Sequence, residues 1–595
     1  MKKRIIQVLF SLLPLCMYED IFAQENNKRN KTPWSGVVSL NYDFTNNFTG
    51  NINLEYNREK WDLHVDYSGH SDRIEISSEL FRIPVGTSIK SLQKIETEQH
   101  HLSHAIGLQL NLRPSSRNLF FGEFKLQFPK ITTNQDVSNN GLNDGVHSTY
   151  DAHNRIAFSR KTIEGSLAHK YIFEENKHEL STSGVFSYTE DSRPATYHIN
   201  EILSHTADGK ESPRFAQLQA DYLYTFANEG QLEAGIHFFS RWNKTRYYFH
   251  DKAQNSEEWV NNPNLNQGVD HSEFVYSAYL SYSRQWGEQF SCKIGLYSDY
   301  DISRTTLLQT NRKNNTNRFY PYPRLTIQYH LSDRQELALH FNRESIRPDY
   351  VQLNPYTNPI DPITFERGNP FLRPEIMNRI ALQYSVTGKQ VQLNSNLYFK
   401  STEKFITPVA LTTTPDTLIM TYTNGGIQNE VGWDINLPAQ IFPWMSLTPS
   451  ISLLHTHSTG KFQGIDLHVD DFCWSSHVEL SLFAGKYTEF QASFSYQSAT
   501  KVPQFKVEEN HYLDLAIKQG FLKDRLQVSF SISDVFDTSK WTARSNQGPL
   551  RLENYSKEAT HAYWIGLTFN FNSYSLRPTA ADSHPQKRST IKIGQ

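Results

Sequence analysis

Two groups of histidines have a spacing that a metal site could use. His100, His101 and His104 lie within five residues, and His455 and His457 are two residues apart. A bound Zn²⁺ needs several ligands placed round one point, which short-range spacing alone does not provide. Histidine pairs are also common on the polar faces of β-strands. We favour this second interpretation and expect no metal ligands and no cofactor.

Catalytic motifs are equally sparse. The sequence contains no Gly-x-Ser-x-Gly elbow, no phosphate-binding loop and no His-Glu-x-x-His motif. The adjacent acids Glu508 and Glu509 fit a solvated loop better than acid–base chemistry. Barrel lipases exist, but no Ser–His pair stands out here. We therefore expect no catalytic residues and no enzyme, and a formal net charge of −3 gives no support for nucleic-acid binding.

The first 23 residues predict an export signal. Lys2, Lys3 and Arg4 precede a mostly apolar run over residues 5–17 that is too short to span a bilayer, and cleavage is expected after Ala23. Lipidation at Cys16 is a minor alternative. A short linker, residues 24–33, follows. Because no later segment has about 18 consecutive apolar residues, any membrane-spanning structure must be a β-barrel.

Composition points the same way. Of the 595 residues, 38% are hydrophobic and 13% aromatic, and the mean hydropathy is −0.59. A soluble chain of this length normally needs more aliphatic residues for its core. A transmembrane barrel does not, since its lumen is polar and only alternate residues face lipid. Cys292 and Cys473 lie far apart in separate predicted strands, so neither a disulfide nor a metal site is expected.

Residues 34–571 predict an all-β, antiparallel barrel of about 22 strands. In one example, Trp61, Leu63, Val65 and Tyr67 alternate with Asp62, His64 and Asp66. The predicted lumen-facing polar residues include Asp62, His64, Asp66, Glu123, Lys125 and Asn394. The predicted strands are 34–44, 48–57, 61–67, 106–112, 120–128, 162–174, 178–190, 214–226, 231–249, 272–285, 289–300, 319–331, 335–343, 374–386, 390–400, 422–437, 445–458, 472–484, 488–499, 511–519, 525–535 and 561–571.

The connections between these strands alternate in length. Short turns are predicted at residues 57–60, 113–117, 175–178, 227–230, 286–288, 332–334, 387–390, 438–444, 485–487 and 520–524. Long polar loops are predicted near 69–99, 130–161, 191–213, 250–271, 344–373, 401–421 and 536–560. Short periplasmic turns and long extracellular loops are typical of outer-membrane barrels. The alternative is a large soluble β-sandwich, solenoid or propeller. The sequence shows no repeat at a fixed period, which a solenoid or a propeller would require.

The loop at residues 343–375, hereafter the proline-rich segment, contains six prolines, so we expect neither a helix nor a central strand in it. It resembles a run found in TonB-dependent outer-membrane receptors of the Bacteroidetes type. The residues that match this run are Arg347, Pro348, Tyr350, Leu353, Asn354, Pro355, Asp361, Pro362, Gly368, Asn369, Pro370, Leu372, Pro374 and Glu375. The resemblance extends to the last strands, including Ile532–Trp541, and covers about residues 34–571.

The resemblance implies a cell outer-membrane protein of a Gram-negative bacterium that binds or takes up an unidentified extracellular ligand. That family normally carries a plug domain before its barrel, and nine residues (25–33) between signal and barrel are too few for one. We therefore expect the plug to be lost or supplied by another polypeptide, with membrane lipid as the other partner. A passive wide pore, or a surface-binding barrel without transport, stays open. Residues 572–595 are expected to form a disordered tail.

Overall fold

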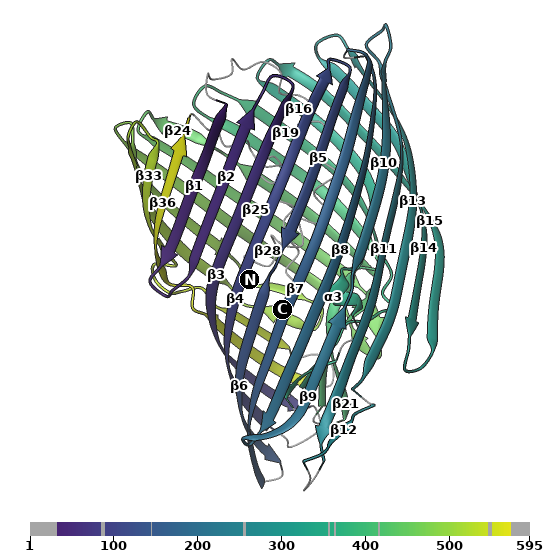
Figure 1. Ribbon diagram of the computed structural model, residues 1–595, viewed down its shortest axis with the longest axis vertical. Helices are drawn as coiled ribbons and strands as arrows, with labels where there is room; N and C mark the ends of the chain where they lie inside the picture. The colour runs from purple at the N-terminus through teal and green to yellow at the C-terminus, as the bar shows by residue number, and fades with distance from the viewer. Residues whose placement is uncertain are drawn as a thin grey trace.

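The computed structural model describes residues 33–572, except 85–89, 144–145, 176, 254–256, 264, 355–356, 362–363, 415–416 and 546–549. The predicted signal peptide, most of the predicted linker and nearly all of the predicted tail therefore lie outside the described residues. Within them the chain is almost entirely β-strand, and its strands close into one antiparallel barrel (Figure 1). No helix in the described ranges is long and apolar enough to cross a membrane.

Twenty-two strands form the closed ring, as predicted, and each predicted strand matches one of them. Closure is made by antiparallel pairing of the first strand with the last, in a register that places Val38 opposite Phe569. In ring order the strands are β1 (Trp34–Asp43), β2 (Phe48–Asn57), β3 (Trp61–Pro84), β4 (Lys90–Ser115), β5 (Asn118–Gln127), β7 (Val146–Glu174), β8 (His178–Ile199), β10 (Arg214–Thr225), β11 (Gln231–Lys252), β13 (Gln267–Trp286), β14 (Phe290–Leu307), β15 (Arg312–Ser332), β16 (Gln335–Ile346), β19 (Glu375–Thr387), β20 (Gln392–Glu403), β23 (Ile427–Asn436), β25 (Met445–Thr459), β28 (Val469–Ala484), β29 (Thr488–Gln497), β32 (Asn510–Phe521), β33 (Leu526–Ser533) and β36 (Ala562–Phe571).

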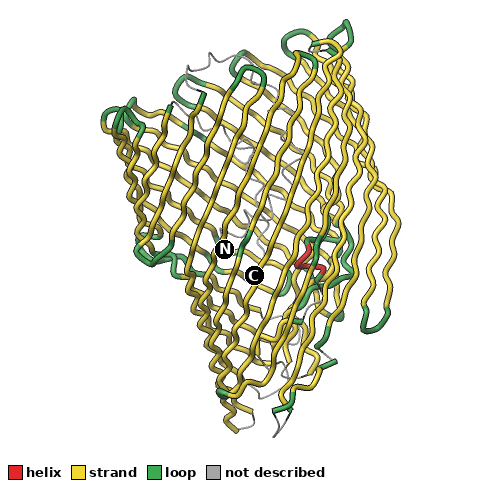
Figure 2. Tube along the Cα trace, in the orientation of Figure 1, coloured by secondary structure: helices red, strands yellow, loops and turns green. Residues whose placement is uncertain are grey.

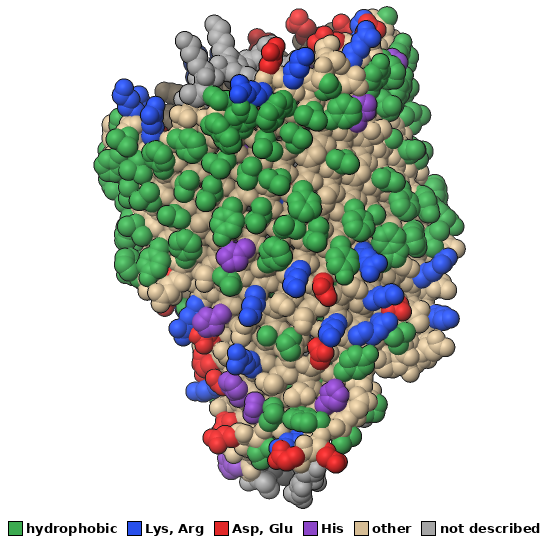
Figure 3. All heavy atoms as spheres, in the orientation of Figure 1, with side chains coloured by type: hydrophobic (Ala, Val, Ile, Leu, Met, Phe, Trp, Pro, Cys, Tyr) green, Lys and Arg blue, Asp and Glu red, His purple; other side chains and the backbone are tan. Residues whose placement is uncertain are grey.

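The two faces of each ring strand differ as period-two alternation requires. Leu108, Leu110 and Leu567 lie on the outer face, where about two-fifths of each side chain is exposed. They belong to an apolar band around one half of the molecule (Figure 3). On the opposite face, Asp62 is buried and accepts hydrogen bonds from Asn111 and Arg113. An apolar exterior and a polar interior suit a barrel whose outer face contacts lipid.

Several expected long loops are instead strands. β3 and β4 stay paired from Trp61–Leu112 to Arg82–Ser91. They and their neighbours form a wall of long strands that extends past the rest of the ring at one end of the barrel (Figure 2). Polar alternation supports the extension: Arg73 on β3 forms an ion pair of 2.5 Å with Glu98 on β4. The prediction of loops at 69–99, 130–161 and 191–213 was therefore wrong, because solvated strands retain cross-strand pairing without an apolar face.

Except for β24 (Ala439–Phe442), which lies at the opposite end, the remaining strands lie at this long-loop end or beside the ring (Figure 1). The others are β6 (Lys130–Asn143), β9 (Ile202–Glu211), β12 (Trp259–Asn261), β17 (Asn358–Asp361), β18 (Thr364–Glu366), β21 (Ile406–Thr414), β22 (Thr417–Asn424), β26 (Lys461–Phe462), β27 (Ile465–Asp466), β30 (Thr500–Val502), β31 (Phe505–Val507), β34 (Trp541–Ser545) and β35 (Leu550–Glu558). The opposite end has short turns, such as residues 522–524. The two ends are therefore structurally distinct.

Four of these short strands form a separate sheet in the order β17-β18-β22-β21, which we call the inner sheet. It combines the proline-rich segment with the hairpin at residues 406–424. The single-turn helix α3 (Tyr350–Leu353) and strands β17 and β18 correct the expectation of a loop without helix. Pro359 is tolerated because β17 is an edge strand, where a missing N–H breaks no ladder.

Candidate functional site at the long-loop end

Arg347 in the proline-rich segment is the best-connected charged residue at the inner face of the wall. Its Nη2 donates a hydrogen bond of 3.1 Å to Asp299, and its Nε lies 3.2 Å from Glu273 and 3.7 Å from Asp301. Arg241 pairs with Glu273 from the other side at 2.5 Å. Although burial alone would lower the pKa of Arg347, the three carboxylates outweigh it and raise that pKa. The guanidinium therefore stays charged and holds the segment to β13 and β14.

The conformation of the proline-rich segment depends on close backbone contacts. A side chain at Gly368 would lie 2.4–2.7 Å from the carbonyl oxygens of Val351, Gln352 and Asn354, so only glycine fits against α3. The segment also contains a tight turn, with the Leu372 amide donating to the Asn369 carbonyl at 3.3 Å. These contacts give the conformation of the segment a physical basis in its own sequence.

Two polar residues of the segment fasten it to neighbouring elements. The Asn369 amide donates to the Tyr422 carbonyl at 3.0 Å, joining the segment to β22. The Glu375 carboxylate accepts from the Ile406 amide at 2.5 Å, which fixes the start of β21. Leu372 is buried, and Pro348, Leu353, Pro370 and Pro374 complete the described matching residues. Pro355 and Pro362, with the side chains of Tyr350 and Asp361, lie outside the described part of the chain.

Polar contacts also tie the inner sheet to distant parts of the wall. Arg82 on β3 donates to Thr364 on β18 at 2.8 Å, and both side chains are buried. Asn354 donates to Glu211 on β9 at 3.2 Å, and Tyr247 on β11 contacts the same carboxylate. Thr364 is thus an internal contact and not an exposed loop position.

One half-buried acid belongs to the inner sheet itself. Partial burial raises the pKa of Glu366 on β18, although a hydrogen bond with Asn358 partly offsets the effect. The neighbouring Tyr422 on β22 has its pKa raised to about 12, first by burial and then by nearby Glu366. The strand pair β18–β22 therefore carries two titratable groups that are partly shielded from water.

Apolar packing holds the rest of the inner sheet. Ala410 and Leu418 pack with Leu80 of β3 and with residues from β31, β34 and β35. Val409 and Phe405 pack against Ile465 and Leu467 beside β27. Together with the Arg347 and Arg82 contacts, this anchors the inner sheet to the wall at β3 and the adjoining β31–β35, at β9–β14, and at β27. An element attached to such separate arcs of the ring crosses the mouth of the barrel.

Sequence reasoning identified the proline-rich segment but not its partners. Glu273, Asp299 and Asp301 lie on inward faces of long strands, where an acid is usually only part of a hydrated wall. The spacing of Asp299 and Asp301 placed both on one face, but the sequence carried no signal that Arg347 would meet them. Arg82 was missed for a similar reason, since it lies in a region predicted as loop.

The candidate metal residues have separate partners. His100 contacts Glu98 at 3.1 Å, His101 contacts Gln99 at 3.1 Å, and His104 contacts Tyr67 at 2.9 Å. His455 and His457 both contact Asp470, at 3.0 and 3.5 Å. Across the described ranges no group of three or more His, Cys, Asp or Glu side chains has an arrangement that would hold a metal ion.

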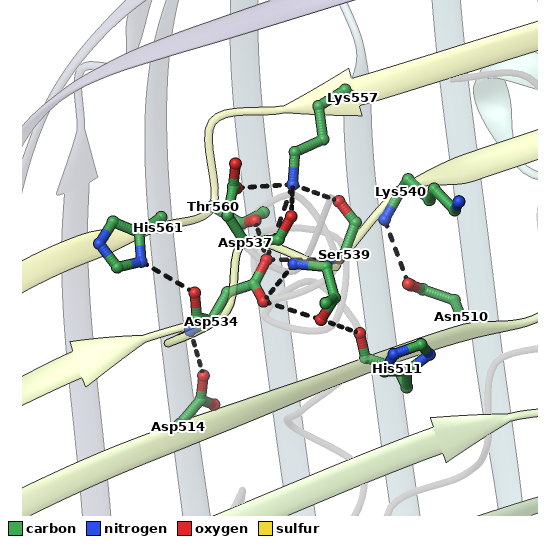
Figure 4. Close-up of polar contacts among 11 residues, drawn as sticks. Asn510, His511, Asp514, Asp534, Asp537, Ser539, Lys540, Lys557, Thr560 and His561 are labelled. Carbon is green, nitrogen blue, oxygen red and sulfur yellow. Dashed lines mark hydrogen bonds and ion pairs between the residues drawn. The ribbon is translucent and has the colours of Figure 1, made fainter.

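A second polar cluster lies where β33 ends. The buried Asp534 carboxylate accepts hydrogen bonds from the Thr538 and Ser539 amides, both at 2.9 Å, and from the Thr560 hydroxyl at 2.5 Å (Figure 4). Lys557 lies 3.8 Å from it. Burial alone would raise the pKa of Asp534, but these hydrogen bonds outweigh burial and lower it. The cluster caps a strand end and has no nucleophile-and-base geometry, so its role is structural.

Comparison with known proteins follows this geometry. Residues 171–571 match the outer membrane protein beta-barrel family. Similar solved structures include the copper transporter OprC (10% identity, TM-score 0.64, 92% of this chain and 82% of that one). They also include the ferric citrate transporter FecA (12% identity, TM-score 0.61, 90% of this chain and 78% of that one). A third is the ferric yersiniabactin uptake receptor FyuA from Yersinia pestis (12% identity, TM-score 0.62, 92% of this chain and 81% of that one). No curated protein matches the chain. At these identities the structures show the fold alone.

Proposed function

The chain belongs to the outer membrane protein beta-barrel family, and from this premise we propose that it is a receptor of the TonB-dependent kind. In this proposal the long-loop end faces the outside of the cell and binds a ligand there for uptake. The resemblance of the proline-rich segment supports assignment to the Bacteroidetes type. The transporters and receptors among similar structures agree with a role in transport and not in catalysis.

One observation carries the proposal: the inner sheet crosses the mouth and is anchored to three arcs of the ring. A passive wide pore has no use for a half-buried guanidinium that meets three carboxylates at that mouth. A receptor does, because a closed mouth presents a fixed surface to a ligand and prevents leakage through a large lumen. In this proposal the inner sheet has two functions: it presents a surface to the ligand, and it closes the mouth of the barrel.

Conductance in a planar lipid bilayer tests the closure. We expect the wild-type barrel to give small or absent steady currents. Arg347→Ala should open larger currents, because it removes the cation that Asp299 and Asp301 share and leaves Glu273 with Arg241 alone, and breaking a buried ion pair typically costs about 3–5 kcal/mol. Arg117→Ala, at a short turn, is the matched control and should behave as wild type. A steady wide-pore conductance in the wild type, unchanged in Arg347→Ala, would favour the passive pore instead.

We further propose that a plug-like polypeptide from a second chain completes the receptor, as the resemblance implies. Affinity purification from outer membranes, with a tag on the full chain, should recover such a polypeptide at a ratio near one to one. Recovery of the barrel alone under mild detergent, with transport intact, would remove this part of the proposal.

A further inference from the structure

A dense group of cations lies on the outer face of the wall, directly beyond the apolar band. We call it the basic patch. Figure 3 shows Lys and Arg side chains gathered there, on the long-loop side of the band. Its members lie on neighbouring strands from β6 to β14: Lys130, Lys161, Lys210, Arg214, Lys244, Arg246 and Arg304.

Strand register places these cations in adjacent rows. In the row farthest from the band, Lys130 is paired with Ser159, Ser159 with Ser192, Ser192 with Lys210, and Lys210 with Arg246. Directly paired side chains on one face of a sheet lie about 5 Å apart. In this row Lys210 and Arg246 are therefore direct neighbours, and two serines separate them from Lys130.

The next two rows lie closer to the band. Lys161 is paired with Glu190, and Lys244 with Asp270. In the last row Arg214 lies between two aromatic residues, Tyr188 and Trp242. Its guanidinium carbon is 5.3 Å from the Tyr188 ring centre. Aromatic rings of this kind are typical of the level of lipid headgroups.

The charge of the basic patch is unbalanced. Its seven cations face two acids in the same rows and a third, Asp208, beside Lys210, a local charge of +4 in a chain whose net charge is −3. In the described part of the chain, ion pairs reach two of the seven: Arg246 lies 2.7 Å from Asp270 and Lys210 lies 3.8 Å from Asp208. The excess positive charge therefore faces outward, toward an anionic partner.

Apolar side chains continue directly from the basic patch along the same strands. Ile163 follows Lys161 on β7, Phe186 precedes Tyr188 on β8, and Leu218 follows Arg214 on β10. About half of each of these side chains is exposed on the outer face. A molecule bound across this boundary would meet cations at one end and hydrocarbon-compatible surface at the other.

We propose that the basic patch binds the phosphate groups of a lipid whose headgroup carries more than one phosphate, in the leaflet at the long-loop end. Lys and Arg beside the membrane attract anionic headgroups, and arginine can bind a phosphate through two parallel hydrogen bonds. Three rows of cations suit several phosphates better than a single one. The proposal rests only on membrane placement of the barrel and is independent of ligand uptake.

Native mass spectrometry of the detergent-purified full chain, titrated with lipid A as a bisphosphorylated probe, tests the proposal. We expect saturable binding that weakens with salt, because exposed charges are screened within about 10 Å at 0.1 M ionic strength. The triple variant Lys161→Gln, Arg214→Gln, Lys244→Gln should bind about tenfold or more weakly, since each basic residue near a membrane contributes roughly 1 kcal/mol. Phosphatidylcholine, a zwitterionic probe, should bind equally to both proteins.

The matched control removes the same number of cations from the short-turn end: Lys389→Gln, Lys486→Gln, Lys523→Gln. It should bind lipid A like the wild type. Heat-modifiable gel mobility confirms that each barrel is folded, which exposed substitutions should preserve. Equal lipid A affinity in the wild type and the patch variant overturns the proposal, as does an equal loss in the control. Binding of inorganic pyrophosphate as tight as that of lipid A would identify a free-anion site and also overturn it.

Discussion

At the scale of single residues, the conformation of the inner sheet depends on a few small and charged side chains whose contacts a substitution would disrupt. Gly368 lies against two carbonyl oxygens of α3 and that of Asn354 just after it, and backbone atoms cannot move aside as a flexible side chain can. We therefore predict that Gly368→Ala displaces the proline-rich segment and raises bilayer conductance while the ring remains folded. The measurement is single-channel current, with gel mobility as the folding check.

Gly165→Ala is the matched control for this prediction. An added methyl group at Gly165 would meet only one atom, at 4.0 Å, so both conductance and folding should equal wild type. Identical currents from Gly368→Ala and wild type would show that the close approach to α3 does not maintain closure.

Asp534 makes a separate, pH-dependent prediction. Since its folded-state pKa is lowered, it contributes stability that is present above its unfolded pKa, about 3.9, and that is lost as pH falls through the folded value. At neutral pH, Asp534→Asn should lower the free energy of unfolding by roughly 1–3 kcal/mol. Urea unfolding in lipid vesicles should show that the difference in unfolding free energy between the wild type and Asp534→Asn becomes smaller below about pH 4. A difference in unfolding free energy that does not change with pH would contradict the lowered pKa of Asp534.

At the scale of strands, alternation specifies which face meets lipid. Leu567 and Thr568 on β36 lie on the outer and inner faces, and Leu393 and Asn394 on β20 follow the same alternation. Leu567→Arg should cost about 2–4 kcal/mol if it lies near the bilayer midplane, and Thr568→Arg much less. Folding yield of the four arginine variants in lipid vesicles tests this. Equal damage on both faces would indicate strands buried on both sides.

The sequence allowed all 22 ring strands to be predicted because lipid imposes a strict rule on their outer faces. It did not allow the strand extensions beyond the band to be predicted, since no apolar stripe marks a solvated strand. Residues 74–83 continue the alternation of β3, with Leu80 and Arg82 turned inward, yet charged residues such as Arg73 and Glu75 suggested a loop. The inner sheet was missed because its pairings join residues about 50 positions apart, as for Thr364 and Leu418.

The proline-rich segment shows what local sequence can and cannot reveal. Its six prolines led to the expectation of a loop, which α3 and the short strands β17 and β18 correct. Its position depends on Glu211, Glu273 and Arg82, which come from strands far away in the chain. Such long-range contacts follow from ring order and register, and a local motif cannot specify them.

At the scale of the whole molecule, the two ends of the barrel differ. One ends in short turns, and the other carries the extended wall, the inner sheet and the basic patch (Figures 1 and 3). An outer-membrane receptor needs this asymmetry, because the ligand arrives from one side only. The account therefore depends on which end is exposed at the cell surface.

Cysteine labelling on intact cells tests this orientation most directly. Glu201 lies at an exposed turn of the long-loop end and Lys523 at an exposed short turn. In a background with Cys16, Cys292 and Cys473 replaced by serine, a membrane-impermeant maleimide should label Glu201→Cys on intact cells. It should label Lys523→Cys only after the outer membrane is permeabilised. Labelling of Lys523→Cys but not Glu201→Cys on intact cells, or recovery of the protein from the soluble periplasm, would contradict the account.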